Sequence, residues 1–244
     1  MPRFYVTSPD ISGAKITITD RDQVHHIRNV LRLKEKEEVV FFDDRSHEYK
    51  TEIVKSSAQS IILKIKEKKK LVITEKTRIT VACAIAKNSK IDDIIDKLTQ
   101  LGVDRIIPLK TKRVIVNFDD KKRETRLMRW RKIAQSAGLQ SQRNNFPIIE
   151  PVKDIHEVLA ESGDFDLKLI PTLLGQRQSL NNVFTKSKYK NILVLIGPEG
   201  DFTPQEVALA KQAGCIAVSL GDLVLRVETA AIATVSFIRF YAEG

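Results

Sequence analysis

Hydrophobic and polar residues alternate in short runs along the first third of the chain and follow longer periods afterwards. Alternation with period two is typical of strands that are buried on one face. It predicts strands over residues 3–7, 15–19, 39–42, 47–54 and 61–65. Residues 20–33 are predicted as a helix that Asp20 caps, with Val24, Ile27 and Leu31 on its apolar face. This succession predicts a small, mostly β barrel.

From residue 78 onward, continuous apolar runs alternate with helical patterns. The runs predict buried strands at 79–85, 105–109, 166–170, 192–196 and 216–220, with a further short one at 114–116. The predicted helices are 90–101, capped by Ser89 and ended by Gly102, then 120–139, one that starts at 204, and 229–241. Strands that alternate with helices predict an α/β domain with a mostly parallel sheet.

A change of composition marks the boundary between the β-rich first part of the chain and the α/β second part. The lysine-rich run 66–70 and the polar run 74–77 mark the expected boundary, so the predicted domains are 1–73 and 74–244. No apolar run approaches the ~20 residues of a membrane span, and the first six residues lack the apolar core of a signal peptide. Cys83 and Cys215 lie in apolar runs, which predicts buried thiols in a reducing cytoplasm rather than a disulfide.

Positive charge is concentrated in one segment. The formal net charge is +10, and residues 121–143 alone contain eight Lys or Arg residues against one acid, Glu124. The apolar stripe of the same predicted helix consists of Leu127, Trp130, Ile133, Ala134 and Ala137. A solvated helix face is one interpretation, but the concentration favours a surface that contacts nucleic-acid phosphates.

Several common site motifs are absent from the sequence. It contains no Gly-x-x-x-x-Gly-Lys-Ser/Thr phosphate loop, no Gly-x-Gly-x-x-Gly dinucleotide motif and no Gly-x-Ser-x-Gly nucleophile motif. The pair His25–His26 has no Cys, His or carboxylate partners at zinc-site spacing, so no metal is expected. These absences argue against NTPase, NAD-dependent and hydrolase functions.

Three loops remain at the expected carboxyl ends of strands, where α/β proteins bind ligands. They span residues 171–175, 197–200 and 220–230. The second, Gly197-Pro-Glu-Gly200, is followed by helix-start signals, with Thr203 as N-cap, Pro204 at the first helical position and Glu206 closing a capping box. In the third, Arg226, Glu228 and Thr229 cluster just before an apolar helix, which favours a functional site. The alternative interpretation is a salt-bridged loop with Thr229 as an N-cap.

The second and third loops together resemble a known signature. Ile196-Gly-Pro-Glu-Gly200 followed by Leu220-Gly-x-x-x-Leu-Arg-x-Glu-Thr-Ala230 is similar to the C-terminal motifs of SPOUT-class RNA methyltransferases. More narrowly, it resembles the family that methylates N3 of a uridine in small-subunit ribosomal RNA. Further matches in that family's order are Arg3-Phe-Tyr-Val6, His26 with Val30-Leu-Arg32, 97–103 and Gln140-Ser-Gln-Arg143. The resemblance therefore covers nearly the whole chain.

The resemblance implies a fold, a cofactor and partners. It implies an N-terminal PUA-like β-barrel that binds RNA, a C-terminal α/β domain with a trefoil knot, and a homodimer. It further implies S-adenosylmethionine (SAM) in the knot and 16S ribosomal RNA in the 30S subunit as substrate, with no membrane or metal. The cofactor residues it implies are Thr172, Leu173, Leu174, Ile196, Gly197, Pro198, Glu199, Gly200, Leu220, Gly221 and Leu225. The implied RNA contacts are Arg3, His26, Arg32, Arg129 and Arg143.

The implied catalytic residues are Arg226, Glu228 and Thr229. Uridine N3 must lose its proton before it attacks the methyl group, so Arg226 is expected to stabilise the developing anion with its fork of donors. Glu228 would orient that arginine or accept the proton. The chain departs from the family's pattern at Asp201, where a second glycine is common, and at 222–224, where Pro-Arg-Ile is common.

Two other classes stay open from the sequence. A ribose 2′-O methyltransferase of the same superfamily would share the cofactor loops and modify a different atom. A non-enzymatic RNA-binding assembly factor would keep the barrel and the basic helix but would have lost the pocket.

Overall fold

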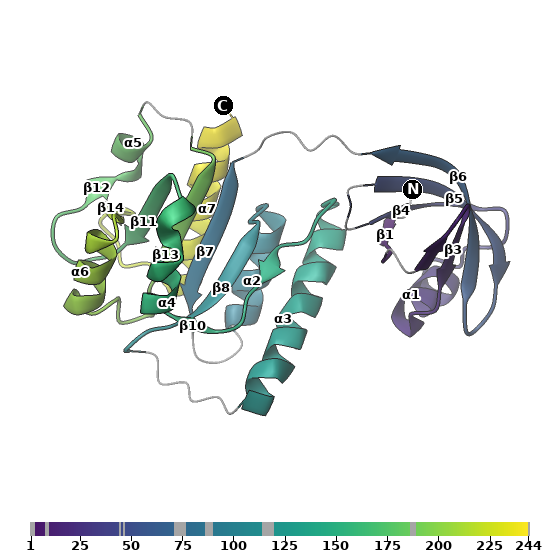
Figure 1. The fold of residues 1–244 in the computed structure, drawn as a ribbon, viewed down its shortest axis with the longest axis horizontal. Helices are drawn as coiled ribbons and strands as arrows, with labels where there is room; N and C mark the ends of the chain where they lie inside the picture. The colour runs from purple at the N-terminus through teal and green to yellow at the C-terminus, as the bar shows by residue number, and fades with distance from the viewer. Residues whose placement is uncertain are drawn as a thin grey trace. The chain divides into compact units, whose positions relative to one another are not determined.

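The structure of the protein is a computed structural model that describes residues 3–7, 10–43, 45, 47–70, 77–85, 90–113, 120–185 and 189–243. The chain divides into two compact units (Figure 1). The first consists of residues 1–74 and 139–145, and the second of residues 75–138 and 146–244. The short segment 139–145 belongs to the first unit, which the linear pattern of the sequence did not indicate.

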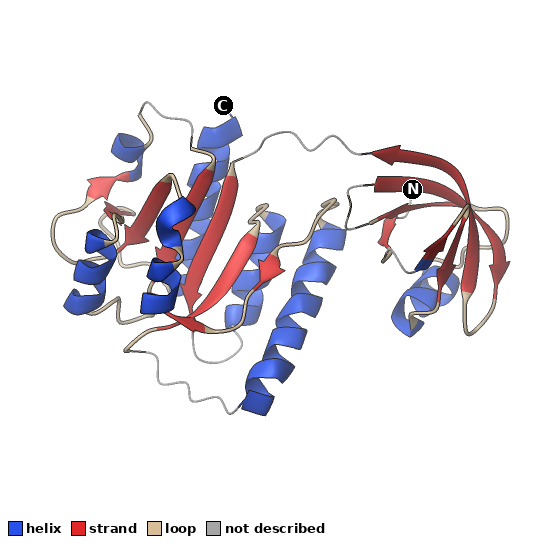
Figure 2. Cartoon of the chain, viewed as in Figure 1, coloured by secondary structure: helices blue, strands red, loops and turns tan. Residues whose placement is uncertain are grey.

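The first unit is built on one six-stranded sheet with the order β1-β4-β5-β6-β3-β2 (Figure 2). Its elements are β1 (Arg3–Tyr5), β2 (Ile11–Ser12), β3 (Lys15–Ile18), α1 (Arg21–His25), the π-helical turn η2 (His26–Val30), β4 (Glu38–Phe42), β5 (His47–Ser56) and β6 (Ile61–Lys70). Strand β1 pairs with β4 in parallel, and the other neighbours are antiparallel. A curled sheet with one helix closing its core matches the predicted mostly β unit.

Three details of this unit test the sequence-based expectations. Asp20 caps α1 as predicted, because its side chain accepts a hydrogen bond from the Gln23 backbone N–H. The expectation that Leu31 lies on the buried face was wrong: the helix ends at Val30, and Leu31 is 37% exposed. The lysine run 66–70, which was expected to mark the domain boundary, forms the end of β6 and pairs with β5 as far as His47 opposite Lys70. Pairing with β5 satisfies the backbone N–H and C=O groups of that segment, while its lysine side chains remain exposed to solvent.

The second unit contains an eight-stranded sheet whose paired strands are all parallel. The order is β10-β8-β7-β13-β11-β14-β12, with β9 paired to β8. Its strands are β7 (Arg78–Ala84), β8 (Arg105–Lys110), β9 (Ile148–Ile149), β10 (Lys153–Asp154), β11 (Leu167–Pro171), β12 (Gln178–Ser179), β13 (Asn191–Ile196) and β14 (Ile216–Ser219). The predicted parallel α/β architecture is confirmed.

Helices cover both faces of this sheet (Figure 1). They are α2 (Lys90–Gln100), α3 (Asp120–Gln140), α4 (Ile155–Ala160), the 3-10 turn η3 (Ser162–Asp164), α5 (Leu180–Val183), α6 (Pro204–Gln212) and α7 (Val227–Glu243). Alternate residues of β13 enter different cores: Ile192, Val194 and Ile196 pack with α2, α3 and α7, whereas Leu193 and Leu195 pack with α4 and α6. Burial on both faces explains why the sequence of β13 is continuously apolar.

The helix ends agree with the sequence at some places and not at others. At α6, Thr203 and Glu206 form the predicted capping box, and Pro204 is at the first helical position. Helix α2 ends before Gly102, whose φ of +82° suits glycine. Thr229 is not an N-cap, because α7 begins at Val227 and the Ala230 N–H already donates to the Arg226 carbonyl at 2.8 Å. The predicted cap Ser89 and the strand predicted at 114–116 lie outside the described residues.

Both cysteines are buried free thiols, as predicted. Burial raises the pKa of the Cys83 thiol to about 12, and the negative charge of Glu228 contributes to the increase. Burial also raises the pKa of Cys215, to about 11, although the positive charge of Lys168 acts in the opposite direction. Both groups are therefore protonated thiols near neutral pH.

Candidate functional site

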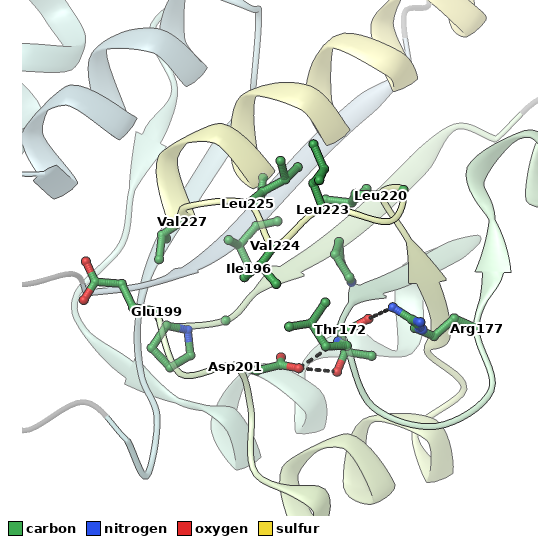
Figure 3. A pocket seen from close by; sticks show the side chains of 16 residues that line it. Thr172, Arg177, Ile196, Glu199, Asp201, Leu220, Leu223, Val224, Leu225 and Val227 are labelled. Carbon is green, nitrogen blue, oxygen red and sulfur yellow. Dashed lines mark hydrogen bonds between the residues drawn. The ribbon is translucent and has the colours of Figure 1, made fainter.

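A pocket lies at the carboxyl ends of β11, β13 and β14, where the three loops singled out in the sequence meet. It encloses about 580 Å³ of empty space, part of which is open to solvent. Figure 3 shows Leu223, Val224 and Leu225 on one side and Thr172, Asp201 and Arg177 on the opposite side. The site thus combines an apolar wall with a polar one.

Nine of the eleven predicted cofactor residues line this pocket. They are Thr172, Leu173, Ile196, Gly197, Pro198, Glu199, Leu220, Gly221 and Leu225. Leu174 and Gly200 are not among the lining residues. The lining also includes residues that the sequence reasoning did not assign, namely Pro171, Arg177, Asp201, Leu223, Val224, Val227 and Ala230. No sequence motif marks Arg177 as a pocket residue. Its closeness in sequence to the first loop is the only signal that could have identified it.

Thr172 is the centre of the polar wall, and its polar groups are all used within the protein. Its N–H donates to the Val218 carbonyl at 3.3 Å, and its hydroxyl donates to Asp201 Oδ2 at 2.9 Å. The same hydroxyl accepts from the Leu174 N–H at 3.2 Å, and the Thr172 carbonyl accepts from Arg177 Nη1 at 3.3 Å. With only 6% of its surface exposed, Thr172 holds the loop in place rather than facing the pocket with a free hydroxyl.

Two of the pocket glycines are required for different physical reasons. A Cβ on Gly197 would lie 2.9 Å from the ring of Phe202, which is fully buried in the core beside α6. Gly221 has a φ of +110°, a conformation that residues with side chains rarely adopt. Close packing against Phe202 is therefore sufficient to require glycine at position 197.

The predicted catalytic residues lie at the start of α7, beside the pocket rather than in its lining. Arg226 is exposed and is flanked by the lining residues Leu225 and Val227. Its side chain makes no hydrogen bond or ion pair within the described part of the chain, so it is not held by Glu228. Thr229 is exposed in the first turn of α7.

Glu228 is turned toward the sheet. Its charge acts on the thiol of Cys83 in β7. Its Oε2 atom is buried and has no hydrogen-bond partner among the residues that the structure describes. A buried carboxylate oxygen without a partner is energetically costly in the folded protein.

The predicted RNA contacts are distributed over both units. Arg3, His26, Arg32 and Arg143 belong to the first unit, the last through segment 139–145, and Arg129 belongs to the second. His26 is exposed and packs edge-on against Phe4, with 5.8 Å between the ring centroids. Arg32 is exposed with a left-handed φ of +56°.

Arg3 is engaged inside the first unit. It pairs with Glu48 at 2.9 Å, donates to the Gln142 carbonyl and to Asn144, and lies over the ring of Phe42 at 4.8 Å. Its position therefore explains how segment 139–145 is attached to the first sheet.

Neither a metal cluster nor a membrane span is found in the described residues. No group of three or more His, Cys, Asp or Glu side chains among them could hold a metal ion. None of the helices in the same part of the chain is long and apolar enough to cross a bilayer.

Comparison with known proteins adds independent information. Residues 74–239 match the RNA methyltransferase domain family, and residues 18–66 match the RNA methyltransferase PUA domain family. Ribosomal RNA small subunit methyltransferase E of Bacillus subtilis is 29% identical, over 100% of this chain and 98% of that protein. The Rickettsia conorii protein of the same name is 32% identical, over 97% of this chain and 94% of that protein.

Solved structures agree with these matches. The Neisseria gonorrhoeae ribosomal RNA small subunit methyltransferase E bound to SAM has a TM-score of 0.85 and 29% identity, covering 98% of this chain and 97% of that one. A Legionella pneumophila protein described as a methyltransferase, in complex with SAM, has a TM-score of 0.87 and 26% identity, covering 98% and 96%. The chain therefore belongs to the ribosomal RNA small subunit methyltransferase E family of RNA methyltransferases.

Proposed function

We propose that this protein transfers the methyl group of SAM to N3 of a uridine in 16S ribosomal RNA. The observation that carries the proposal is the pocket at the carboxyl ends of β11, β13 and β14, where the predicted cofactor residues converge. Membership of the methyltransferase E family identifies the substrate class.

The pocket suits SAM in its chemistry, because its lining combines apolar and polar side chains. Ile196, Leu220 and Leu225 supply apolar surface for the adenine, and the backbone groups of the three loops supply hydrogen bonds to its edge. Glu199, which is exposed at the rim, is suited to a ribose hydroxyl or to the cationic end of the cofactor.

SAM supplies a methyl group already activated by the sulfonium, so the protein's task is alignment and management of charge. We infer that Arg226 donates hydrogen bonds to the uridine as N3 loses its proton, since its guanidinium is exposed beside the pocket. Glu228, with its unpartnered buried oxygen, is the proposed acceptor of that proton. Thr229 lies one residue further along the same turn and is proposed to contact the substrate.

The RNA is proposed to bind both units through its phosphates. The exposed residues Arg32 and His26 would contact it from the first unit, and α3 with Arg129 from the second. Arg143 and Arg3 are proposed to contribute near segment 139–145. In this arrangement both units contact the RNA, and the second unit also holds the cofactor.

Three further features are proposed from the family resemblance. A trefoil knot is compatible with the strand order, in which β13 lies between β7 and β11 and β14 lies on the other side of β11. A homodimer is supported by exposed apolar side chains, with Leu223 77%, Val224 73% and Phe240 76% exposed. A ribosomal substrate would place the protein in the cytoplasm.

Methyl transfer to isolated 30S subunits and to naked 16S ribosomal RNA, followed by identification of the modified nucleoside, tests the proposal. The expected product is 3-methyluridine. A ribose-methylated nucleoside would instead assign the protein to 2′-O chemistry. Absence of SAM binding in a calorimetric titration would identify a non-enzymatic RNA-binding factor.

A further inference from the structure

Asp201 has a backbone conformation that normally calls for glycine. Its φ is +63°, in the left-handed region, and it follows Gly200 in the loop after β13. Aspartate is one of the few residues that tolerate this conformation, at a cost that glycine does not incur. A side chain kept at such a position needs a compensating interaction.

The Asp201 carboxylate provides that interaction, because it joins two of the three pocket loops. Oδ2 accepts hydrogen bonds from the hydroxyl of Thr172 at 2.9 Å and from the backbone N–H of Leu173 at 2.8 Å. Oδ1 accepts from the N–H of Phe202 at 2.7 Å. Figure 3 shows the contacts to the loop after β11, and Asp201 itself lines the pocket.

The loop that carries Asp201 is firmly attached to the rest of the unit. Phe202 is fully buried in the core beside α6. The N–H of Asp201 closes a turn with the Pro198 carbonyl at 2.9 Å, and Arg113 donates to the Gly200 carbonyl. On the other side, Leu173 is 49% exposed. Asp201 therefore links the anchored loop after β13 to Thr172 and Leu173 in the loop after β11.

We propose that Asp201 is a positioning residue that pre-organises the SAM pocket by bridging the loop after β13 to the loop after β11. The inference rests on the proposed function, since it assumes that SAM occupies this pocket. Hydrogen bonds to a carboxylate are stronger than neutral ones. A loop already fixed in its bound position avoids the entropy cost of ordering on ligand binding. Loss of the carboxylate is therefore expected to weaken SAM binding rather than the chemical step.

The test first compares two variants of Asp201 with the wild-type protein by calorimetric SAM titration and by steady-state kinetics. Asp201→Gly keeps the left-handed backbone and removes the bridge, so the SAM affinity is expected to fall about tenfold, as for a lost hydrogen bond to a charged group. The KM for SAM should rise while kcat at saturating SAM stays the same. Asp201→Asn tolerates the backbone and keeps an acceptor oxygen for Thr172 and Leu173, but its NH2 group would face the Phe202 N–H, so it should recover only part of the affinity.

A double variant and a matched control make the test specific. Adding Thr172→Val should weaken binding less in the Asp201→Gly background than in the wild-type protein, because the hydroxyl has already lost Asp201 as its acceptor and keeps only the Leu174 N–H as a partner. Asp222→Gly, an equivalent change at an exposed residue of the third loop outside the pocket lining, should leave the affinity unchanged.

The outcomes separate this inference from the proposed function. If the wild-type protein binds SAM and Asp201→Gly binds it equally well, the positioning role is overturned and the proposed function stands. A fall in kcat with an unchanged KM for SAM would also overturn it. If the wild-type protein does not bind SAM, the proposed function fails and this inference fails with it.

Discussion

The carboxylate of Asp92 on α2 accepts a hydrogen bond from the indole Nε1 of Trp130 on α3 at 3.0 Å. Trp130 is 1% exposed and lies in the core between the two helices and the sheet. The second carboxylate oxygen of Asp92 pairs with Arg129 at 2.6 Å. A single acid thus attaches the strongly basic helix α3 to its neighbour.

Replacing Asp92 by Ala is expected to lower the free energy of unfolding by roughly 1–3 kcal/mol, because the buried indole N–H of Trp130 loses its acceptor. Urea denaturation monitored by tryptophan fluorescence measures the change. Asp92→Asn keeps an acceptor oxygen, so its free energy of unfolding should decrease less than that of Asp92→Ala. Equal stability of Asp92→Ala and the wild-type protein would show that water replaces the carboxylate without cost.

Replacing Arg226 by Ala is expected to reduce methylation of ribosomal RNA roughly 100-fold or more, as for loss of a donor that stabilises an anion in the transition state. The SAM affinity should change little, because Arg226 is outside the pocket lining. Arg226→Lys keeps the positive charge but not the fork of donors, so its methylation rate should lie between those of the wild-type protein and Arg226→Ala. Single-turnover rates with SAM at saturation measure this, and an unchanged rate would remove Arg226 from the chemistry.

Salt dependence of RNA binding tests the role of α3. Arg131 and Lys132 are exposed on this helix. If both contact phosphates, replacing each by Gln should make the slope of log affinity against log salt shallower by about 0.7–0.9 per contact. Fluorescence anisotropy with a 16S ribosomal RNA fragment at several salt concentrations measures the slope. Glu124→Gln on the same helix removes no phosphate contact and should not make the slope shallower.

The two cysteines are expected to be unreactive toward a thiol reagent in the folded protein at pH 8. The raised pKa values, about 12 for Cys83 and about 11 for Cys215, keep both thiols protonated, and both are buried. Both should react quickly in denaturant. Rapid labelling of either cysteine in the native state would indicate local opening around it.

The same pKa values predict a loss of stability at high pH. The unfolded chain releases the thiol protons near pH 9, the ordinary value, whereas the folded chain retains them up to about pH 11 to 12. Over that interval the unfolded state binds fewer protons, so the free energy of unfolding falls as the pH rises. Replacing Cys215 by Ser should reduce this pH dependence.

Local signals in the sequence were sufficient to predict most of the helices and strands of the second unit. The apolar run of β13 and the capping box of Thr203 and Glu206 depend on residues close in sequence, and both are found as expected. The two buried free thiols and the parallel α/β arrangement follow from the same kind of pattern. The three loops that meet at the pocket could also be predicted from the sequence, because each loop directly follows a strand.

Only the tertiary structure decided how those loops are connected. The bridge from Asp201 to Thr172 joins residues 29 positions apart, and no local pattern encodes it. The same applies to Arg3, whose partners Gln142 and Asn144 attach a distant segment to the first unit. Periodicity determined the elements, since a helix or strand depends on near neighbours. Long-range hydrogen bonds determined the site, since they require two loops to be brought together by the sheet.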